Sequence, residues 1–320
     1  MEKYYNLEAE YYEKKAAKTT SNKVGLAVLS FIAFDNFVML ILTTLIVFIP
    51  SLSMLVSDSV FMNLFSAFIS VFGFIFCGLF AIKLQNRKVS EIVELKKPKK
   101  YTGWLILVGM GVCILANVIT GLVGSLLPFE PVMSEPKVPT SISGIIIYFI
   151  TTAFVPAFVE EFFYRGVIFG SFKKFGKTVA IVVSSVLFSL IHGNLVQIPF
   201  AFVVGLILGS ITAEAESIWP AIIIHFLNNF MACTQTYIGI LFGENTASFY
   251  FIIYGMIYIA IGLVSIVIYA TKVKGNVFKF EKTPHVTKTS GLIKYTLLSS
   301  SNIVFYVYVA ITVILLQFSR

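Results

Sequence analysis

Charged residues are scarce in this chain of 320 residues, and their scarcity argues against a soluble globular protein. Asp, Glu, Lys and Arg make up only 12% of the residues, whereas a soluble domain contains about 25%. Hydrophobic residues make up 58% of the chain and form long runs that alternate with short charged patches. This arrangement predicts a multi-pass membrane protein that folds as one helical bundle.

Cysteine is rare as well, which argues against a fold held together by disulfides. Cys77, Cys113 and Cys233 all fall within apolar runs, and none of them shows a CxxC spacing. We therefore expect neither a disulfide framework nor a thiolate zinc site, and we predict that all three cysteines are buried packing residues.

The chain has an excess of positive charge, with 24 Lys and Arg residues against 16 Asp and Glu residues. This excess does not indicate a nucleic-acid partner, because the basic residues lie in loops beside hydrophobic runs. In such loops they orient the chain and meet anionic lipid headgroups. We therefore expect membrane lipids as partners, and no nucleic acid.

The apolar runs predict an all-α, polytopic integral membrane bundle of about eight or nine transmembrane helices. Helices are the only open-chain structures that satisfy backbone hydrogen bonds in lipid, so each run is interpreted as a helix. Gly205 and Gly209 form a GxxxG pattern, which predicts a close helix crossing. The nine predicted spans are residues 24–49, 59–82, 104–129, 145–172, 178–194, 196–212, 218–242, 249–271 and 296–317.

The positions of Lys and Arg predict the orientation of the chain. If the N-terminus is cytosolic, the cytosolic tail and loops contain 21 of the 24 basic residues. This asymmetry predicts a multi-pass protein of the cell membrane with a cytosolic N-terminus. The predicted organisation is a cytosolic N-terminal tail at 1–23, N-terminal transmembrane helices and loops at 24–142, a polar-residue-bearing core at 143–243 and C-terminal transmembrane helices at 244–320.

Strongly polar residues are few within the spans, and most of them lie in the core segment. Counted from the predicted cytosolic helix ends at 1.5 Å per residue, they lie at depths of about 14–22 Å. Since the hydrocarbon core is about 30 Å thick, three separate helices bring polar groups to a similar level near the midplane. The residues of this set are Glu160, Glu161, Arg165, His192, His225 and Asn229.

The spacing of these residues predicts hydrolytic chemistry. Glu161 and Arg165 are four residues apart, so they share a helix face and can form an ion pair. Glu160 is rotated by about 100° from Glu161, which leaves it free to act as a general base on water. His225 and Asn229 are also four residues apart and can donate hydrogen bonds to a developing oxyanion.

The same residues form three motifs, EEFFYR at 160–165, FSLIH at 188–192 and HFLNN at 225–229. They resemble the EExxxR, FxxxH and HxxxN motifs of the CPBP family, which comprises CAAX proteases and bacteriocin-processing enzymes. Because the three motifs occur in this order in separate apolar spans, residues 143–243 are expected to be a CPBP-like catalytic core.

This resemblance implies an integral-membrane endopeptidase that cleaves a hydrophobic or lipid-associated peptide, with a role in peptide processing or bacteriocin immunity. Glu160 matches the catalytic glutamate of the family, and His192 matches the histidine beside it that activates water. His225 and Asn229 match the oxyanion-side residues. The pair formed by Glu161 and Arg165 matches the supporting acidic and basic residues.

Three alternatives remain open at this stage. Glu160, His192 and His225 could supply three zinc ligands with one open position, but the sequence lacks HExxH and a mechanism without a cofactor is preferred. A proton-coupled transporter would also place ionisable residues in the membrane, although no inverted repeat supports it. The third alternative is a non-catalytic membrane immunity or scaffold protein.

Overall fold

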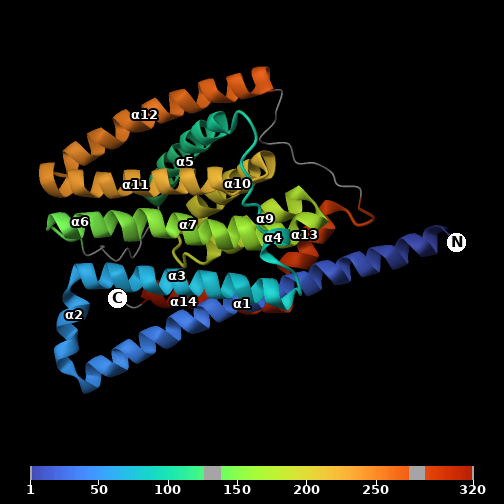
Figure 1. The fold of residues 1–320 in the computed structure, drawn as a ribbon, viewed down its shortest axis with the longest axis horizontal. Helices are drawn as coiled ribbons and strands as arrows, with labels where there is room; N and C mark the ends of the chain where they lie inside the picture. Colours follow the sequence, from blue (N-terminus) through green and yellow to red (C-terminus); the bar gives the residue numbers. More distant parts are fainter. Residues whose placement is uncertain (1, 126–137, 274–284, 319–320) are drawn as a thin grey trace.

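The computed structural model describes residues 2–125, 138–273 and 285–318, and these ranges contain no β-strand, which confirms the all-α prediction. Helices α6 and α7 run through the middle of the bundle, with α3 and α1 on one side and α11 and α12 on the other (Figure 1). The α-helices are α1 Glu2–Phe48, α2 Ser53–Ser57, α3 Ser59–Leu84, α4 Val89–Ile92, α5 Thr102–Ser125, α6 Ile142–Phe149, α7 Val155–Glu161, α8 Phe169–Phe172, α9 Lys177–Leu190, α10 Gln197–Ala215, α11 Trp219–Phe242, α12 Glu244–Ile268, α13 Thr289–Leu297 and α14 Ser300–Phe318.

Six helical segments of the described chain are long and apolar enough to cross a membrane, which confirms a polytopic bundle. The number rises to seven if α13 and α14, which are bent by 63° at their junction, are counted as one span. By length and apolarity, the count is thus lower than the predicted eight or nine. The six segments are Leu7–Phe48, Ser59–Leu84, Thr102–Gly124, Ile142–Phe175, Gln197–Ala215 and Glu244–Val273.

Two predicted spans account for most of the difference. Helix α9 has 14 residues, which corresponds to about 21 Å and is too short for a hydrocarbon core of about 30 Å. Helix α11 has 24 residues, but it carries His225, Asn228 and Asn229 in place of apolar side chains and is not among the six segments. Polar site residues thus reduce the hydropathy of the helix that presents them.

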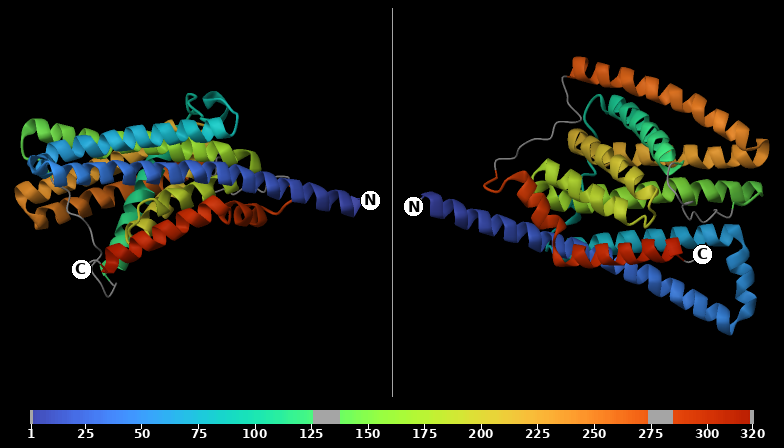
Figure 2. Two further views of the ribbon diagram at one scale, coloured as in Figure 1. Left: turned by 90° about the horizontal axis from the view of Figure 1, so that it is seen from below. Right: turned by 180° about the vertical axis from the view of Figure 1, so that it is seen from behind.

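Helix α1 is longer than the sequence suggests. It runs without a break from Glu2 to Phe48, so the segment predicted as a polar tail is helical from its second residue. The early part of α1 projects beyond the rest of the bundle (Figure 2). Further along, Ser21 Oγ donates to the carbonyl of Thr296 at 2.7 Å and accepts from Asn302 Nδ2 at 3.1 Å. These buried polar contacts join the first helix to α13 and α14.

The helix that carries both glutamates is continuous but irregular. Two π-helical segments, Ile150–Phe154 and Phe162–Ile168, interrupt the α-helical geometry between Ile142 and Phe175. Pro156 lies two residues after the end of the first segment and has no N–H to donate to the carbonyl of Thr152. The turn before the proline therefore widens, and the Thr152 carbonyl is left for another donor.

Buried side chains surround this central helix. Phe163, Tyr164 and Phe169 are at most 1% exposed and belong to the largest hydrophobic cluster of the described residues. All three cysteines are buried and free, as predicted.

Helix α10 crosses α9 closely, as the GxxxG pattern predicts. A Cβ atom at Gly205 would lie 2.9 Å from the Cβ of Ser185, and one at Gly209 would lie 3.4 Å from Cγ2 of Ile181. This close approach brings the Gly205 backbone within reach of the central helix.

Candidate active site

The two adjacent glutamates of the central helix occupy different environments. Glu161, the last residue of α7, is fully buried, whereas Glu160 is half-buried. Successive residues of a helix point about 100° apart, so one side chain faces the protein interior while the other is directed elsewhere. The two carboxylates are therefore suited to different tasks, as the sequence predicts.

Glu161 is held by two partners through a single oxygen atom. Its Oε1 accepts hydrogen bonds from Arg165 Nη1 at 2.8 Å and from His225 Nδ1 at 2.8 Å. The side chains of Glu161 and Arg165 are completely buried, and that of His225 is 10% exposed. The predicted ion pair between Glu161 and Arg165 is thus confirmed. The bond from His225 is an addition that the sequence analysis did not include.

Arg165 is fixed by two further contacts. Its Nη2 donates to the carbonyl of Gly205 at 3.4 Å, and its guanidinium carbon lies 4.2 Å from the ring centroid of Phe188. A guanidinium over an aromatic face is stabilised by the ring quadrupole, more strongly when it is removed from water. Three helices therefore hold the cation in place.

His192 lies just after the end of α9 and is half-buried. Its Nδ1 is 2.9 Å from the carbonyl of Phe188. Because a carbonyl oxygen can only accept, Nδ1 carries the proton of this bond. A neutral His192 then has its free lone pair on Nε2, which can accept a proton from water.

The ring of Phe188 connects the three motifs. Its centroid lies 5.1 Å from that of His192 and 6.1 Å from that of His225, with interplanar angles of 78° and 82°. Arg165 covers the same ring, as described above. Side chains that are far apart in the sequence thus lie around one phenylalanine. This agrees with the similar depths estimated by counting residues along the predicted helices.

Asn229 belongs to a line of amide side chains. Its Nδ2 donates to the Thr152 carbonyl at 3.4 Å, the acceptor that Pro156 leaves unused. Asn228 Nδ2 donates to Asn229 Oδ1 at 3.4 Å, and Asn117 Nδ2 of α5 donates to Asn228 Oδ1 at 3.4 Å. These distances lie at the long end of the hydrogen-bond range, so the amides can change partners at low cost.

Glu160 makes no hydrogen bond or ion pair to the described residues. Its charge acts on Tyr164, four residues further along the same helix, and on Arg165. The Tyr164 hydroxyl is buried and has no hydrogen-bond partner within the described ranges. Sequence reasoning gave Tyr164 no role, although its spacing of four residues from Glu160 places the two on one helix face.

The residues proposed as an alternative zinc site do not fit a metal ion. Within the described parts of the chain, no three His, Cys, Asp or Glu side chains are grouped so that they could hold one. His225 directs Nδ1 to Glu161 and His192 directs Nδ1 to a backbone carbonyl, which leaves only Nε2 of each ring as a possible ligand. We therefore derive no chemical step through a metal.

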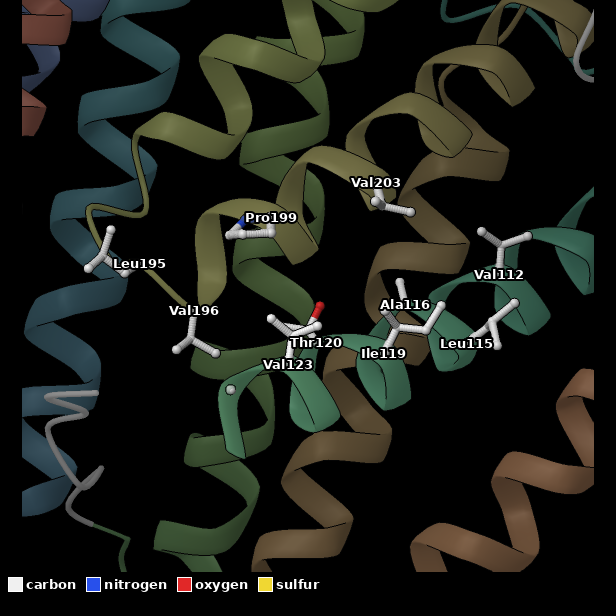
Figure 3. A pocket seen from close by; sticks show the side chains of 11 residues that line it. Val112, Leu115, Ala116, Ile119, Thr120, Val123, Leu195, Val196, Pro199 and Val203 are labelled. Carbon is white, nitrogen blue, oxygen red and sulfur yellow. The ribbon is translucent and has the colours of Figure 1, made fainter. Parts of the chain in front are cut away.

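An apolar groove opens between α5 and the start of α10 (Figure 3). Its volume is about 210 Å³, and Thr120 provides the one polar side chain among the residues that line it. Leu195 of the groove lies three residues after His192 in the sequence, and on α5 the groove includes Ala116, the neighbour of Asn117.

Residues 142–231 match the family model described as Rce1-like, type II CAAX prenyl endopeptidase Rce1-like. The match contains both glutamates, the arginine, both histidines and the asparagine of the site. No curated protein and no solved structure is similar enough to match the chain.

Proposed function

We propose that this chain, which carries a domain of the CAAX/CPBP protease family, is an intramembrane endopeptidase that uses glutamate-activated water. The observation that carries the proposal is the contrast between the two adjacent carboxylates. Glu161 is occupied by Arg165 and His225, whereas Glu160 is half-buried and has no hydrogen-bond partner in the described residues. Glu160 is therefore the carboxylate that is left to bind and deprotonate water.

In the proposed reaction, a water molecule attacks the carbonyl carbon of the scissile peptide bond and gives its proton to Glu160. His192 orients this water through Nε2, since Nδ1 is engaged by a backbone carbonyl. The proton then passes from Glu160 to the departing amine as the carbon–nitrogen bond breaks, which restores the carboxylate. General acid–base catalysis of this kind contributes about 10²–10⁴-fold to a rate.

The oxyanion of the tetrahedral intermediate is assigned to His225 and Asn229. An asparagine amide has two N–H donors, and only one of those of Asn229 is directed at the Thr152 carbonyl. His225 directs Nδ1 at Glu161, and its Nε2 can donate a hydrogen bond only when both ring nitrogens carry a proton. Donors of this type are worth about 3–4 kcal/mol each in the transition state.

We further propose that the substrate is a hydrophobic or lipid-associated peptide. The apolar groove between α5 and α10 supports this, because an alkyl chain attached near the scissile bond could lie against Ala116, Leu195 and Val203. Leu115, Ile119 and Val203 of the groove are exposed apolar side chains, so we propose that the groove opens to lipid and admits a substrate laterally from the bilayer. A role in bacteriocin immunity stays a prediction from the family resemblance.

The test is the near-isosteric change Glu160→Gln in the full-length protein, reconstituted in liposomes. The probes are a farnesylated CaaX peptide and its unmodified counterpart, with cleavage followed by mass spectrometry. We expect the cleavage rate to fall at least 100-fold, the lower end of the general-base contribution. Asp35→Asn is the matched control, because it removes a half-buried carboxylate from α1, outside the site.

The outcome against this mechanism is full cleavage by a well-folded Glu160→Gln protein. Equal cleavage of the two peptides would support the peptidase activity but contradict the proposal that the substrate is lipid-associated. If no peptide is cleaved by the unaltered protein, a comparison of membrane peptidomes with and without the protein provides the wider search. The absence of any protein-dependent product in that comparison would favour the non-catalytic scaffold.

A further inference from the structure

A second pocket, which is polar, lies where two membrane helices end. It is formed by the connection after α3 and by the segment around α8. Its volume is about 340 Å³. Four cationic and two carboxylate side chains contribute to its lining, which are Arg87, Lys96, Lys173, Lys174, Glu91 and Glu94. None of these residues belongs to the candidate active site.

The pocket is at the level of lipid headgroups. One membrane-crossing segment ends at Leu84, three residues before Arg87, and another ends at Phe175, next to Lys174. Cationic side chains just beyond the apolar part of a membrane helix meet the phosphates of the adjacent leaflet. This placement depends only on where the two helices end, and it holds for either orientation of the chain.

Both carboxylates of the pocket are already engaged. Glu94 Oε1 accepts from Lys173 Nζ, and Glu91 accepts from Arg87 at its side chain and at its backbone carbonyl. Lys174 is in a different situation, because the charges that act on it are those of Arg87 and Lys23, both positive. The pocket therefore holds a surplus of positive charge that an anion would offset.

One oxygen atom in the pocket lacks a donor. Oε2 of Glu94 is buried and has no hydrogen-bond partner among the described residues. This oxygen is closed off from solvent, so it does not offer an acceptor to a ligand in the pocket, and recognition would rest on the cationic side chains. The pocket thus suits an anionic phosphate group.

We propose that this pocket binds the headgroup of an anionic phospholipid, for which phosphatidylglycerol is the probe. The phosphate lies against Lys174 and Arg87. Basic pockets between membrane helices are known to bind anionic headgroups through the same chemistry. The acyl chains extend along the apolar surface of α3.

The pocket rests directly on the helix that carries the candidate active site. A Cβ atom at Gly170 would lie 2.0 Å from the carbonyl oxygen of Ile92, and one at Gly166 would lie 3.0 Å from Cγ1 of Val93. The connection after α3 therefore touches the helix only one to two turns beyond Glu161. A lipid bound here would brace that end of the helix, whether or not the protein is a peptidase.

The experiment measures lipid binding by the purified full-length protein in detergent. Phosphatidylglycerol with a fluorophore on one acyl chain is titrated, binding is followed by polarisation, and phosphatidylcholine with the same label is the comparison. We expect clearly tighter binding of phosphatidylglycerol and a loss of about fivefold in Lys174→Gln, since one cation near the surface contributes about that factor. Lys100→Gln is the matched control, because Lys100 is exposed and lies in the same connection outside the pocket.

Equal affinity for the two lipids, or equal losses in Lys174→Gln and Lys100→Gln, would overturn the proposal. Free glycerol 3-phosphate is added as a competitor, and competition as strong as that of unlabelled lipid would assign the pocket to a soluble phosphate instead. Lys96→Gln gives a second measurement if Lys174→Gln fails to fold, with the same expected loss. A melting temperature unchanged from that of the unaltered protein is required of each variant.

Discussion

Removal of Arg165 is expected to be among the most destabilising single changes in this protein. Its guanidinium and the Glu161 carboxylate are completely buried, with Nη1 and Oε1 2.8 Å apart. The change Arg165→Met keeps most of the side-chain volume but leaves Glu161 buried without its cation. Breaking a buried ion pair in this way costs about 3–5 kcal/mol, because the remaining charge is uncompensated.

The structure also predicts that the loss is not additive. Glu161→Gln alone leaves Arg165 buried without an anion, so its cost is expected to be similar. In the double variant no uncompensated charge remains, and a glutamine oxygen can still accept from His225 at the position of Oε1. The double variant is therefore expected to be more stable than the sum of the single losses predicts, by about 2 kcal/mol or more.

A double-mutant cycle provides the measurement. Unfolding of the full-length protein in mixed micelles with a denaturing detergent is followed by circular dichroism for the four proteins of the cycle. Lys18→Met serves as the control, since Lys18 is an exposed cation of α1 and its loss is expected to change stability by less than about 0.5 kcal/mol. A cost below about 1 kcal/mol for Arg165→Met, with additive effects, would refute the reasoning from the buried pair.

Two further predictions concern helix packing and pH. Gly205→Leu adds a side chain whose Cβ would lie 2.9 Å from Ser185, and we expect the free energy of unfolding to fall by about 1–3 kcal/mol in the same assay. Gly121→Ala is the control, because a Cβ there would have no atom within 4 Å, and it should be neutral or slightly stabilising. The hydrogen bond from Lys99 lowers the pKa of Glu216, so the stability that this pair contributes is present above the ordinary glutamate pKa and is lost as the pH falls through the lowered value. Because both side chains are about half exposed, Glu216→Gln should remove this acid dependence and change the unfolding free energy at neutral pH by less than about 1 kcal/mol; a larger change at neutral pH would contradict a surface pair.

Local spacing predicted the parts of the site that lie on one helix. Glu161 and Arg165 are four residues apart, about one helical turn, and form the ion pair that this spacing predicts, although the turn between them is π-helical. The GxxxG pattern predicted a close helix crossing at Gly205 and Gly209, but it did not indicate that the partner is α9. Relations within about two turns of helix are set by geometry that the sequence shows directly.

Relations between helices were predicted only in part. Counting along the helices placed His225 near the glutamates, but nothing in the sequence decides which of two adjacent carboxylates an imidazole 64 residues away will reach. That choice depends on the rotation of α11 about its own axis, which packing of the whole bundle determines. The number of helices long and apolar enough to span a membrane differs from the prediction for a related reason, because hydropathy does not reveal where helix α9 stops.

The electrostatic cost of the two glutamates also explains why the roles divide as proposed. Glu161 is tolerated in a fully buried position because Arg165 offsets its charge within hydrogen-bond distance. Glu160 has no such partner in the described residues and is half-buried, so its ionised form must be solvated by water to be tolerated near the middle of a membrane. We infer that water reaches Glu160 for this reason, and the molecule that solvates the carboxylate is then in position to be deprotonated and to attack a peptide bond.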